Sequence, residues 1–104
     1  MCGIAAIFAY HQDAPPVDRA SLTAMHESLA PRGPDGEGLW FAAENRVAFA
    51  HRRLSIIDLS DSGAQPMASA DGAFRIVFNG EIYNYRELRE ELIASGAVFV
   101  SDSD

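Results

Sequence analysis

The chain has 104 residues, of which 48% are hydrophobic and 22% are charged. This composition is too apolar for intrinsic disorder, and the length suits one small folded domain. The formal net charge is -7, and the 8 Lys and Arg are scattered along the chain. Nucleic acid is therefore not an expected partner, because proteins that bind it carry a clustered basic surface.

The longest apolar run, Cys2 to Tyr10, is far shorter than the roughly 20 residues that cross a bilayer, and no basic segment precedes it. We therefore expect a cytoplasmic protein with no membrane partner. Cys2 is the only cysteine, and the 3 histidines lie in unrelated segments. This excludes an internal disulfide, and we expect no bound metal.

The first elements in chain order are a strand and a helix. Cys2 to Tyr10 has the short apolar run of a buried strand. A helix follows Pro16, with Asp18 as its cap and an end before Pro31, because a proline disfavours helical backbone at the residue before it. The helix has one core face, formed by Leu22, Met25 and Leu29.

The next segment predicts an ordered turn and a hairpin. Pro31 to Gly38 is rich in proline and glycine and leads directly into two strand-like runs, Leu39 to Ala43 and Arg46 to Ala50. Glu44-Asn45 between them has the length and residue types of a tight turn, so the two strands should be antiparallel. A polar loop, Ser60 to Gly72, follows.

The C-terminal part predicts a strand, a helix and a last strand. Ala73 to Asn79 alternates with a period of two, with one face formed by Phe74, Ile76 and Phe78. Asn84 or a neighbour can cap the helix, which Gly96 ends, and its inward face would comprise Leu88, Leu92 and Ile93. A short strand, Ala97 to Val100, completes the order, which suits a mixed sheet with helices on one face.

Cys2 is the residue that most directly suggests chemistry. Removal of Met1 would place a thiol and a free α-amine on one residue. An α-amine ordinarily has a pKa near ~8, so it can relay the thiol proton at neutral pH without a histidine base. On position alone, a small buried hydrophobe at the start of a strand is the simpler explanation of Cys2, and the surrounding motifs have to decide.

Five motifs follow one another along the chain. They are Met1-Cys2-Gly3-Ile4, Arg32-Gly33-Pro34-Asp35-Gly36, His51-Arg52-Arg53-Leu54-Ser55-Ile56-Ile57-Asp58, Gly63-Ala64-Gln65-Pro66-Met67 and Asn79-Gly80-Glu81-Ile82-Tyr83-Asn84. Because these motifs occur in the order found in asparagine synthetases, almost the whole chain resembles the opening half of the glutamine-hydrolysing domain of these enzymes. Related glutamine amidotransferases share the Cys-Gly-Ile opening and the Asn-Gly element but differ at the arginine-glycine turn and at the segment matching His51 to Asp58. We interpret Arg32 to Gly36 as a turn that supports the substrate pocket. Arg32 and Asp35 could form an ion pair across this turn.

The resemblance implies roles for particular residues. Cys2 would attack the glutamine amide, and the Asn79 side-chain NH2 with the Gly80 N–H would form the oxyanion hole. Arg53 matches the arginine that binds the α-carboxylate, and Asp104 matches the aspartate that holds the α-ammonium. The full set implied to bind glutamine is Arg53, Leu54, Ser55, Ile56, Ile57, Asn79, Gly80, Glu81 and Asp104.

The resemblance also implies a fold and a larger parent enzyme. The fold is α+β, a four-layer αββα sandwich of antiparallel sheets typical of N-terminal-nucleophile hydrolases, present here as its N-terminal half. Residues 1–104 would be a partial glutamine amidotransferase domain that is truncated at its C-terminal end. In the parent enzyme a synthetase domain that uses ATP and Mg would follow this segment. The parent enzyme could also form a homodimer. We expect no cofactor in this segment.

Three functions remain after the sequence is read. The first is the glutaminase part of an asparagine synthetase, which supplies ammonia for the conversion of aspartate to asparagine. The second is another N-terminal cysteine amidohydrolase, which would need Cys2 and Asn79 but no charged pair for a free amino acid. The third is an inactive fragment that serves only as a binding module.

Overall fold

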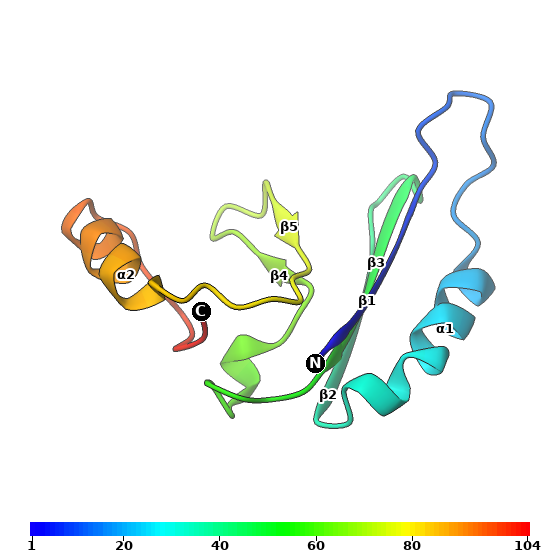
Figure 1. The fold of residues 1–104 in the computed structure, drawn as a ribbon. Coiled ribbons are helices and arrows are strands. Elements are labelled where there is room, and N and C mark those ends of the chain that lie inside the picture. The colour runs from blue at the N-terminus through cyan, green and yellow to red at the C-terminus, as the bar shows by residue number, and fades with distance from the viewer.

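The computed structural model describes residues 1–104. Figure 1 shows three parts side by side, namely a sheet covered by a helix, a short two-stranded ribbon and a second helix. All strand pairs in both sheets are antiparallel, so the architecture is α+β and the expectation of a mixed sheet is wrong. No helix combines the length and the apolarity that crossing a membrane requires.

The main sheet has the strand order β1-β3-β2. The outer strands β1 (Gly3–Phe8) and β2 (Gly36–Phe41) both pair with the central strand β3 (Val47–Arg53). The N-terminal strand and the hairpin are thus confirmed, with somewhat different ends. Asn45 in the hairpin turn has a φ of 51°, in the left-handed region that asparagine tolerates better than most side chains.

Helix α1 (Arg19–Ser28) covers one face of this sheet, as Figure 1 shows. Its predicted cap is confirmed, because the Asp18 carboxylate accepts hydrogen bonds from the Ser21 backbone N–H at 2.9 Å and from the Ser21 hydroxyl at 2.6 Å. These bonds lower the pKa of Asp18. The fully buried Leu22 of α1 belongs to a small core with Ala5, Val17, Ala48 and Ala50. Small side chains on the strands let the helix approach closely.

The two arginines at the end of β3 are used differently. Side chains alternate between the faces of a strand, so Arg52 lies on the same face as Ala48 and Ala50, and Arg53 lies on the opposite face. The Arg52 guanidinium forms an ion pair with Glu37 on β2, and its Nε donates to the His26 carbonyl of α1 at 3.3 Å. Arg52 therefore ties the helix to the sheet.

The turn that leads into β2 is ordered, as predicted, and includes the 3-10 helix η1 (Ala30–Arg32). The Asp35 carboxylate accepts from the Ser55 N–H at 2.9 Å, and Arg32 Nε donates to the Cys2 carbonyl at 3.3 Å. The suggested Arg32–Asp35 pair is thus wrong, because each side chain binds a different neighbouring segment. The turn supports Cys2 through Arg32.

The middle of the chain contains less regular strand than its alternation predicts. The loop from Ser60 to Gly72 includes the 3-10 helix η2 (Asp61–Gly63) and the strand β4 (Met67–Ala68). The expected strand from Ala73 to Asn79 is wrong beyond β5 (Arg75–Ile76). Its expected buried face is also wrong, since Phe74 is 74% exposed and Ile76 is 55% exposed.

Side chains explain where β5 stops. The Phe78 N–H donates to Gln65 Oε1 at 2.6 Å, and the Phe78 carbonyl lies 3.4 Å from His51 Nε2. The backbone groups that a longer strand would offer to a neighbouring strand are therefore taken by side chains. The chain leaves the ribbon at this point and runs toward helix α2 (Tyr85–Ala94), as Figure 1 shows.

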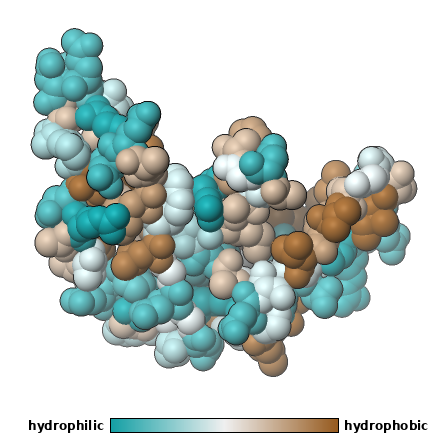
Figure 2. Space-filling view, turned by 180° about the vertical axis from the view of Figure 1, so that it is seen from behind, coloured by the Kyte–Doolittle hydropathy of each residue, from teal (hydrophilic) through white to brown (hydrophobic).

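Helix α2 (Tyr85–Ala94) starts after Asn84 and ends before Gly96, as predicted. Gly96 has a φ of 96°, and the Ala97 N–H returns to the Leu92 carbonyl at 2.9 Å, an arrangement that commonly ends helices. No α2 residue is buried, so the expectation that its apolar face points inward is wrong. Brown apolar surface gathers at this end of the molecule in Figure 2. The α2 side chains Leu88, Leu92 and Ile93 are all exposed.

The last expected strand, Ala97 to Val100, is wrong. All of its residues are exposed, and no strand runs beside them. The chain continues irregularly back toward the middle of the molecule, where the C-terminus lies between α2 and η2 in Figure 1. This return brings Asp104 close to segments far away in the sequence.

Candidate functional site

A cleft of about 350 Å³ brings together the start of β1, the segment after β3, the segment after β5 and the C-terminal residues. It is lined by every site residue expected from the sequence except Ser55, namely Cys2, Arg53, Leu54, Ile56, Ile57, Asn79, Gly80, Glu81 and Asp104. The Ser55 backbone N–H instead donates to the Asp35 carboxylate in the turn before β2. The structure thus collects residues from four separate stretches in one place.

Cys2 lies at one wall of this cleft, directly before β1. Its sulfur is 3.3 Å from the Leu54 N–H, which donates to it, and 3.6 Å from the Leu54 carbonyl, which can accept the thiol proton. Its own carbonyl accepts from Arg32. The thiol is therefore held by backbone groups of the segment that follows β3, and the N–H donor can stabilise negative charge on the sulfur.

Met1 also lines the cleft and is 74% exposed. Met1 is therefore not part of the core. Its removal would open the cleft beside the sulfur and place the free α-amine on Cys2. The position of Met1 is thus compatible with the processing that an N-terminal nucleophile requires.

Arg53 reaches into the cleft from the end of β3. Its Nη1 donates to the Ser60 carbonyl at 2.6 Å, and its Nη2 donates to the Asp58 carbonyl. Gly63 lies so close that a Cβ there would overlap with Nη2. The guanidinium is thus fixed by the loop around η2, and its remaining N–H donors are available to a carboxylate.

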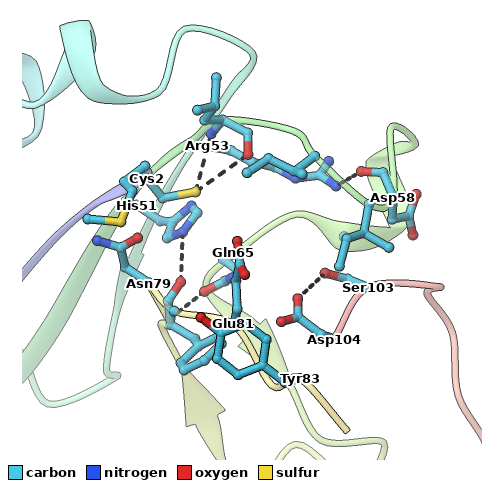
Figure 3. Close-up of a pocket in the computed structure, with 17 residues that line it drawn as sticks. Cys2, His51, Arg53, Asp58, Gln65, Asn79, Glu81, Tyr83, Ser103 and Asp104 are labelled. Carbon is cyan, nitrogen blue, oxygen red and sulfur yellow. Dashed lines mark hydrogen bonds between the residues drawn. The ribbon is translucent and has the colours of Figure 1, made fainter. Parts of the chain in front are cut away.

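Asn79 and Gly80 follow Phe78 on another wall of the cleft and are exposed to it. Figure 3 shows Asn79 on the same side as Cys2 and His51. Because His51 and Gln65 hold both backbone groups of Phe78, the residues that follow it have a defined starting position. An amide side chain and a backbone N–H so placed can donate to an oxygen bound near the sulfur.

Asp104 lies across the cleft. Its Oδ2 accepts from the Ile82 N–H at 2.7 Å, and its Oδ1 accepts from the Ser103 hydroxyl at 3.4 Å. Glu81, next to Ile82, lines the same cleft. The two carboxylates give this part of the cleft a negative charge that suits an ammonium group.

His51 is a site residue that sequence reasoning placed among ordinary packing or surface histidines. It is fully buried in the floor of the cleft, and its Nδ1 has no hydrogen-bond partner. Burial lowers the pKa of His51, with a smaller contribution from Arg53, while the Phe78 carbonyl opposes this shift. The ring is thus neutral at pH 7, with its proton on Nε2 toward Phe78. Its spacing of two residues from Arg53 on one strand was the available signal.

Asp58 is the second residue that was missed. It is buried and lines the cleft, and its carboxylate accepts from the Ser60 hydroxyl at 2.6 Å and from the backbone N–H groups of Ser60 at 2.8 Å and Asp102 at 3.0 Å. These bonds lower the pKa of Asp58 to about 2, so it is ionised at neutral pH. An acidic residue directly after the apolar pair Ile56-Ile57 and before Leu59 was the signal.

The cleft therefore has two chemically different ends. Figure 3 shows Cys2, His51 and Asn79 at one end, and Asp58, Ser103 and Asp104 at the other, with the Arg53 guanidinium reaching toward Asp58. A thiol and hydrogen-bond donors lie at the first end, and opposite charges lie at the second. This arrangement suits a small molecule with a reactive carbonyl at one end and a zwitterionic group at the other.

Known proteins resemble this chain over its full length. A family described as glutamine amidotransferase domain matches residues 1–104. The asparagine synthetase [glutamine-hydrolyzing] 1 of Bacillus subtilis is 46% identical over 105 residues, covering 100% of this chain and 16% of the relative. The amidase chry2 of Gibberella zeae is 38% identical over 112 residues, again covering 100% of this chain and 16% of the relative. The asparagine synthetase 3 of Bacillus subtilis is 38% identical over 89 residues, covering 84% and 14%.

The chain thus spans only 14% to 16% of the length of these relatives. No solved structure matches the chain.

Proposed function

We propose that this chain, which belongs to the glutamine amidotransferase family, is the glutamine-hydrolysing part of an asparagine synthetase. The observation that carries the proposal is the cleft itself, in which the Cys2 sulfur faces a set of donors and the charged groups Arg53 and Asp104 lie on the other side. Asparagine synthetases among the relatives support the choice of parent enzyme.

In the proposed reaction, the Cys2 thiolate adds to the carboxamide carbon of glutamine. The carboxamide oxygen becomes negative and receives hydrogen bonds from the Asn79 side chain and the Gly80 N–H. The carbon–nitrogen bond then breaks, and ammonia leaves with a proton relayed by the Cys2 α-ammonium. Water hydrolyses the resulting thioester, which releases glutamate and restores the thiol.

The charged end of the cleft selects free glutamine over a glutamine residue in a peptide. Arg53 can bind the α-carboxylate through the donors that the Asp58 and Ser60 carbonyls leave free. Asp104 and Glu81 attract the α-ammonium. A peptide glutamine lacks both charges, so it would leave these groups unpaired in the cleft, at a cost in binding.

The finer fold and the whole enzyme belong to the same proposal. A nucleophile directly before the first strand, antiparallel sheets and a helix on one face of the main sheet fit one part of the αββα sandwich of N-terminal-nucleophile hydrolases. The ammonia would pass to a separate synthetase domain, which would use ATP and Mg to activate aspartate. We place the enzyme in the cytoplasm.

Covalent labelling tests the assignment of the nucleophile. A glutamine analogue with an electrophilic ketone in place of the amide is incubated with the intact protein that carries this domain, and the product is digested and analysed by mass spectrometry. We expect one label, on Cys2, whose α-amine is free because Met1 has been removed. Free glutamine should protect Cys2, whereas a glutamine capped at both α-groups should not.

The matched control is Cys2→Ala. It should abolish synthesis of asparagine from glutamine and leave synthesis from free ammonia intact, because the thiol takes no part in the second reaction. A label on another residue, or Met1 retained in an active enzyme, would contradict the proposal. Equal protection by free and capped glutamine would contradict the role of the charged end.

A further inference from the structure

We propose that Asp58 is a positioning residue that joins Arg53 to the C-terminal segment and so sets the spacing between the two groups that receive the charges of glutamine. The inference rests on the function proposed above. It concerns a residue that would not contact the substrate and would act through the groups on either side of it.

The first step is the set of bonds that Asp58 makes. Its carbonyl accepts from Arg53 Nη2, and its Oδ1 accepts from the Ser60 N–H and hydroxyl. Its Oδ2 is directed away from this loop, to the Asp102 N–H at 3.0 Å. Asp58 is buried, so water cannot readily replace these hydrogen bonds.

The second step concerns the C-terminal segment. The bond between Asp58 and Asp102 is the one hydrogen bond that links residues 101–104 to the loop holding Arg53. The other contacts of the segment run elsewhere, from Asp104 to the Ile82 N–H and from Asp102 to Arg89 on α2. Without Asp58, the position of Asp104 relative to Arg53 would depend on α2 and on the strand-free region before it.

The third step is the consequence for binding. A zwitterionic group is recognised well only when the cation and the anion of the site lie at the spacing of its own charges. Arg53 is fixed on one side of Asp58, and Asp104 lies two residues beyond Asp102 on the other. Loss of the link should therefore weaken ground-state binding, while the sulfur and its donors stay in place.

Asp58→Asn is the direct test in the intact protein. The amide keeps the size of the side chain but replaces one carboxylate oxygen with an NH2 group. In either orientation of the amide a donor then meets the N–H of Ser60 or of Asp102, and the negative charge that strengthens both hydrogen bonds is lost. We expect the KM for glutamine to rise about tenfold with kcat within about twofold of the unsubstituted protein. Asp61→Asn is the matched control, because Asp61 is an exposed acid of the same loop, and its KM should not change.

A second pair of variants approaches the link from the other side. Asp102→Pro removes the backbone N–H that Asp58 binds, and Asp102→Ala keeps it while removing the contact with Arg89. Only the proline variant should reproduce the rise in KM. If Asp58→Asn is not recovered in folded form, this pair of variants provides the test instead, since Asp102 is exposed and its substitution disturbs no buried side chain.

A fall in kcat with unchanged KM in Asp58→Asn, or an equal effect in Asp61→Asn, would overturn the proposal. Amide hydrogen exchange distinguishes a failure of this proposal from a failure of the proposed glutaminase function. An Asp102 N–H that exchanges equally fast with Asp58 and with Asn at this position refutes the link, whatever the turnover. A protein that shows the link but no glutamine hydrolysis refutes the proposed function and, with it, the role of Asp58 in binding.

Discussion

Arg52 and Arg53 are adjacent in the sequence but lie on opposite faces of β3. Arg52 bonds to Glu37 and to the His26 carbonyl, whereas Arg53 bonds to the loop around η2 and borders the cleft. The same chemical change at the two positions should therefore have different effects. This pair offers a test in which each variant is the control of the other.

Arg53→Lys should raise the KM for glutamine about tenfold and change kcat little. A lysine has three N–H donors on one atom, so it cannot hold the Asp58 and Ser60 carbonyls and also grip a carboxylate through two parallel bonds. Steady-state kinetics measures both constants. Arg52→Lys should leave KM unchanged and lower stability instead, and a rise in KM in that variant alone would reverse the assignment.

Asn79→Ala should act on the other constant. Its hydrogen bond strengthens as charge develops on the substrate oxygen, so its loss should lower kcat by roughly 10²–10³ and leave KM nearly unchanged. Asn84→Ala is a suitable control, because Asn84 makes no side-chain cap bond and does not line the cleft. Single-turnover kinetics of glutamate release separates the two effects. Weaker binding of glutamine with an unchanged rate of glutamate release would contradict the oxyanion role.

At the scale of residues, most of the candidate site was predictable, because the residue types of a short motif can be recognised directly in the sequence. Arg53, Asn79 and Asp104 could each be proposed from such motifs, and the cleft contains them. Asp58 and His51 were not proposed, because their importance depends on partners far away in the sequence. Neither the Asp102 N–H nor the Phe78 carbonyl leaves a pattern in the residue types around it.

At the scale of elements, the sequence predicted those caps, helix ends and turns that depend only on neighbouring residues. The Asp18 cap, the glycine after α2 and the hairpin around Asn45 are each set by a few neighbouring residues. The alternation in Ala73 to Asn79 predicted a longer strand than β5, because the side chains of Gln65 and His51 compete for the backbone of Phe78. The alternation of apolar and polar residue types does not reveal that competition.

The turn before β2 permits a test at this scale. Gly33 lies against the β3 backbone, and a Cβ there would overlap with the carbonyl of Arg52. Gly33→Ala should therefore lower the free energy of unfolding by about 1–3 kcal/mol, because neither backbone can move freely. Urea unfolding of the chain, followed by the fluorescence of Trp40 on β2, measures this change.

Gly36→Ala is the matched control for the turn. An added Cβ there would lie 3.5 Å from the Arg53 Cβ, which is an ordinary contact, and Gly36 is already part of β2. Its unfolding midpoint should stay the same or rise, because alanine loses less conformational freedom than glycine in a strand. Equal losses in both variants would show that the close approach of Gly33 to β3 does not matter.

At the scale of the whole molecule, the three parts in Figure 1 share little buried surface. Only 11 of 104 residues are buried, and the apolar core comprises 5 residues, all contributed by the main sheet, α1 and the segment before α1. The Cα radius of gyration is 15.1 Å, against roughly 13 Å for a compact domain of this length. The cleft lies where these loosely joined parts meet, so its geometry depends on their relative positions.

We therefore predict that these 104 residues alone are poorly stable and hydrolyse glutamine very slowly, although Cys2, Arg53, Asn79, Gly80 and Asp104 are all present. The physical reason is the exposed apolar surface, including Phe8, Phe74 and the outer face of α2, which favours self-association over one fixed arrangement. Size-exclusion chromatography, urea unfolding and ammonia release should be measured beside the intact protein that carries the domain. A chain that remains monomeric, unfolds cooperatively and matches the glutaminase turnover of the intact protein would show that the main sheet and α1 suffice to organise the cleft.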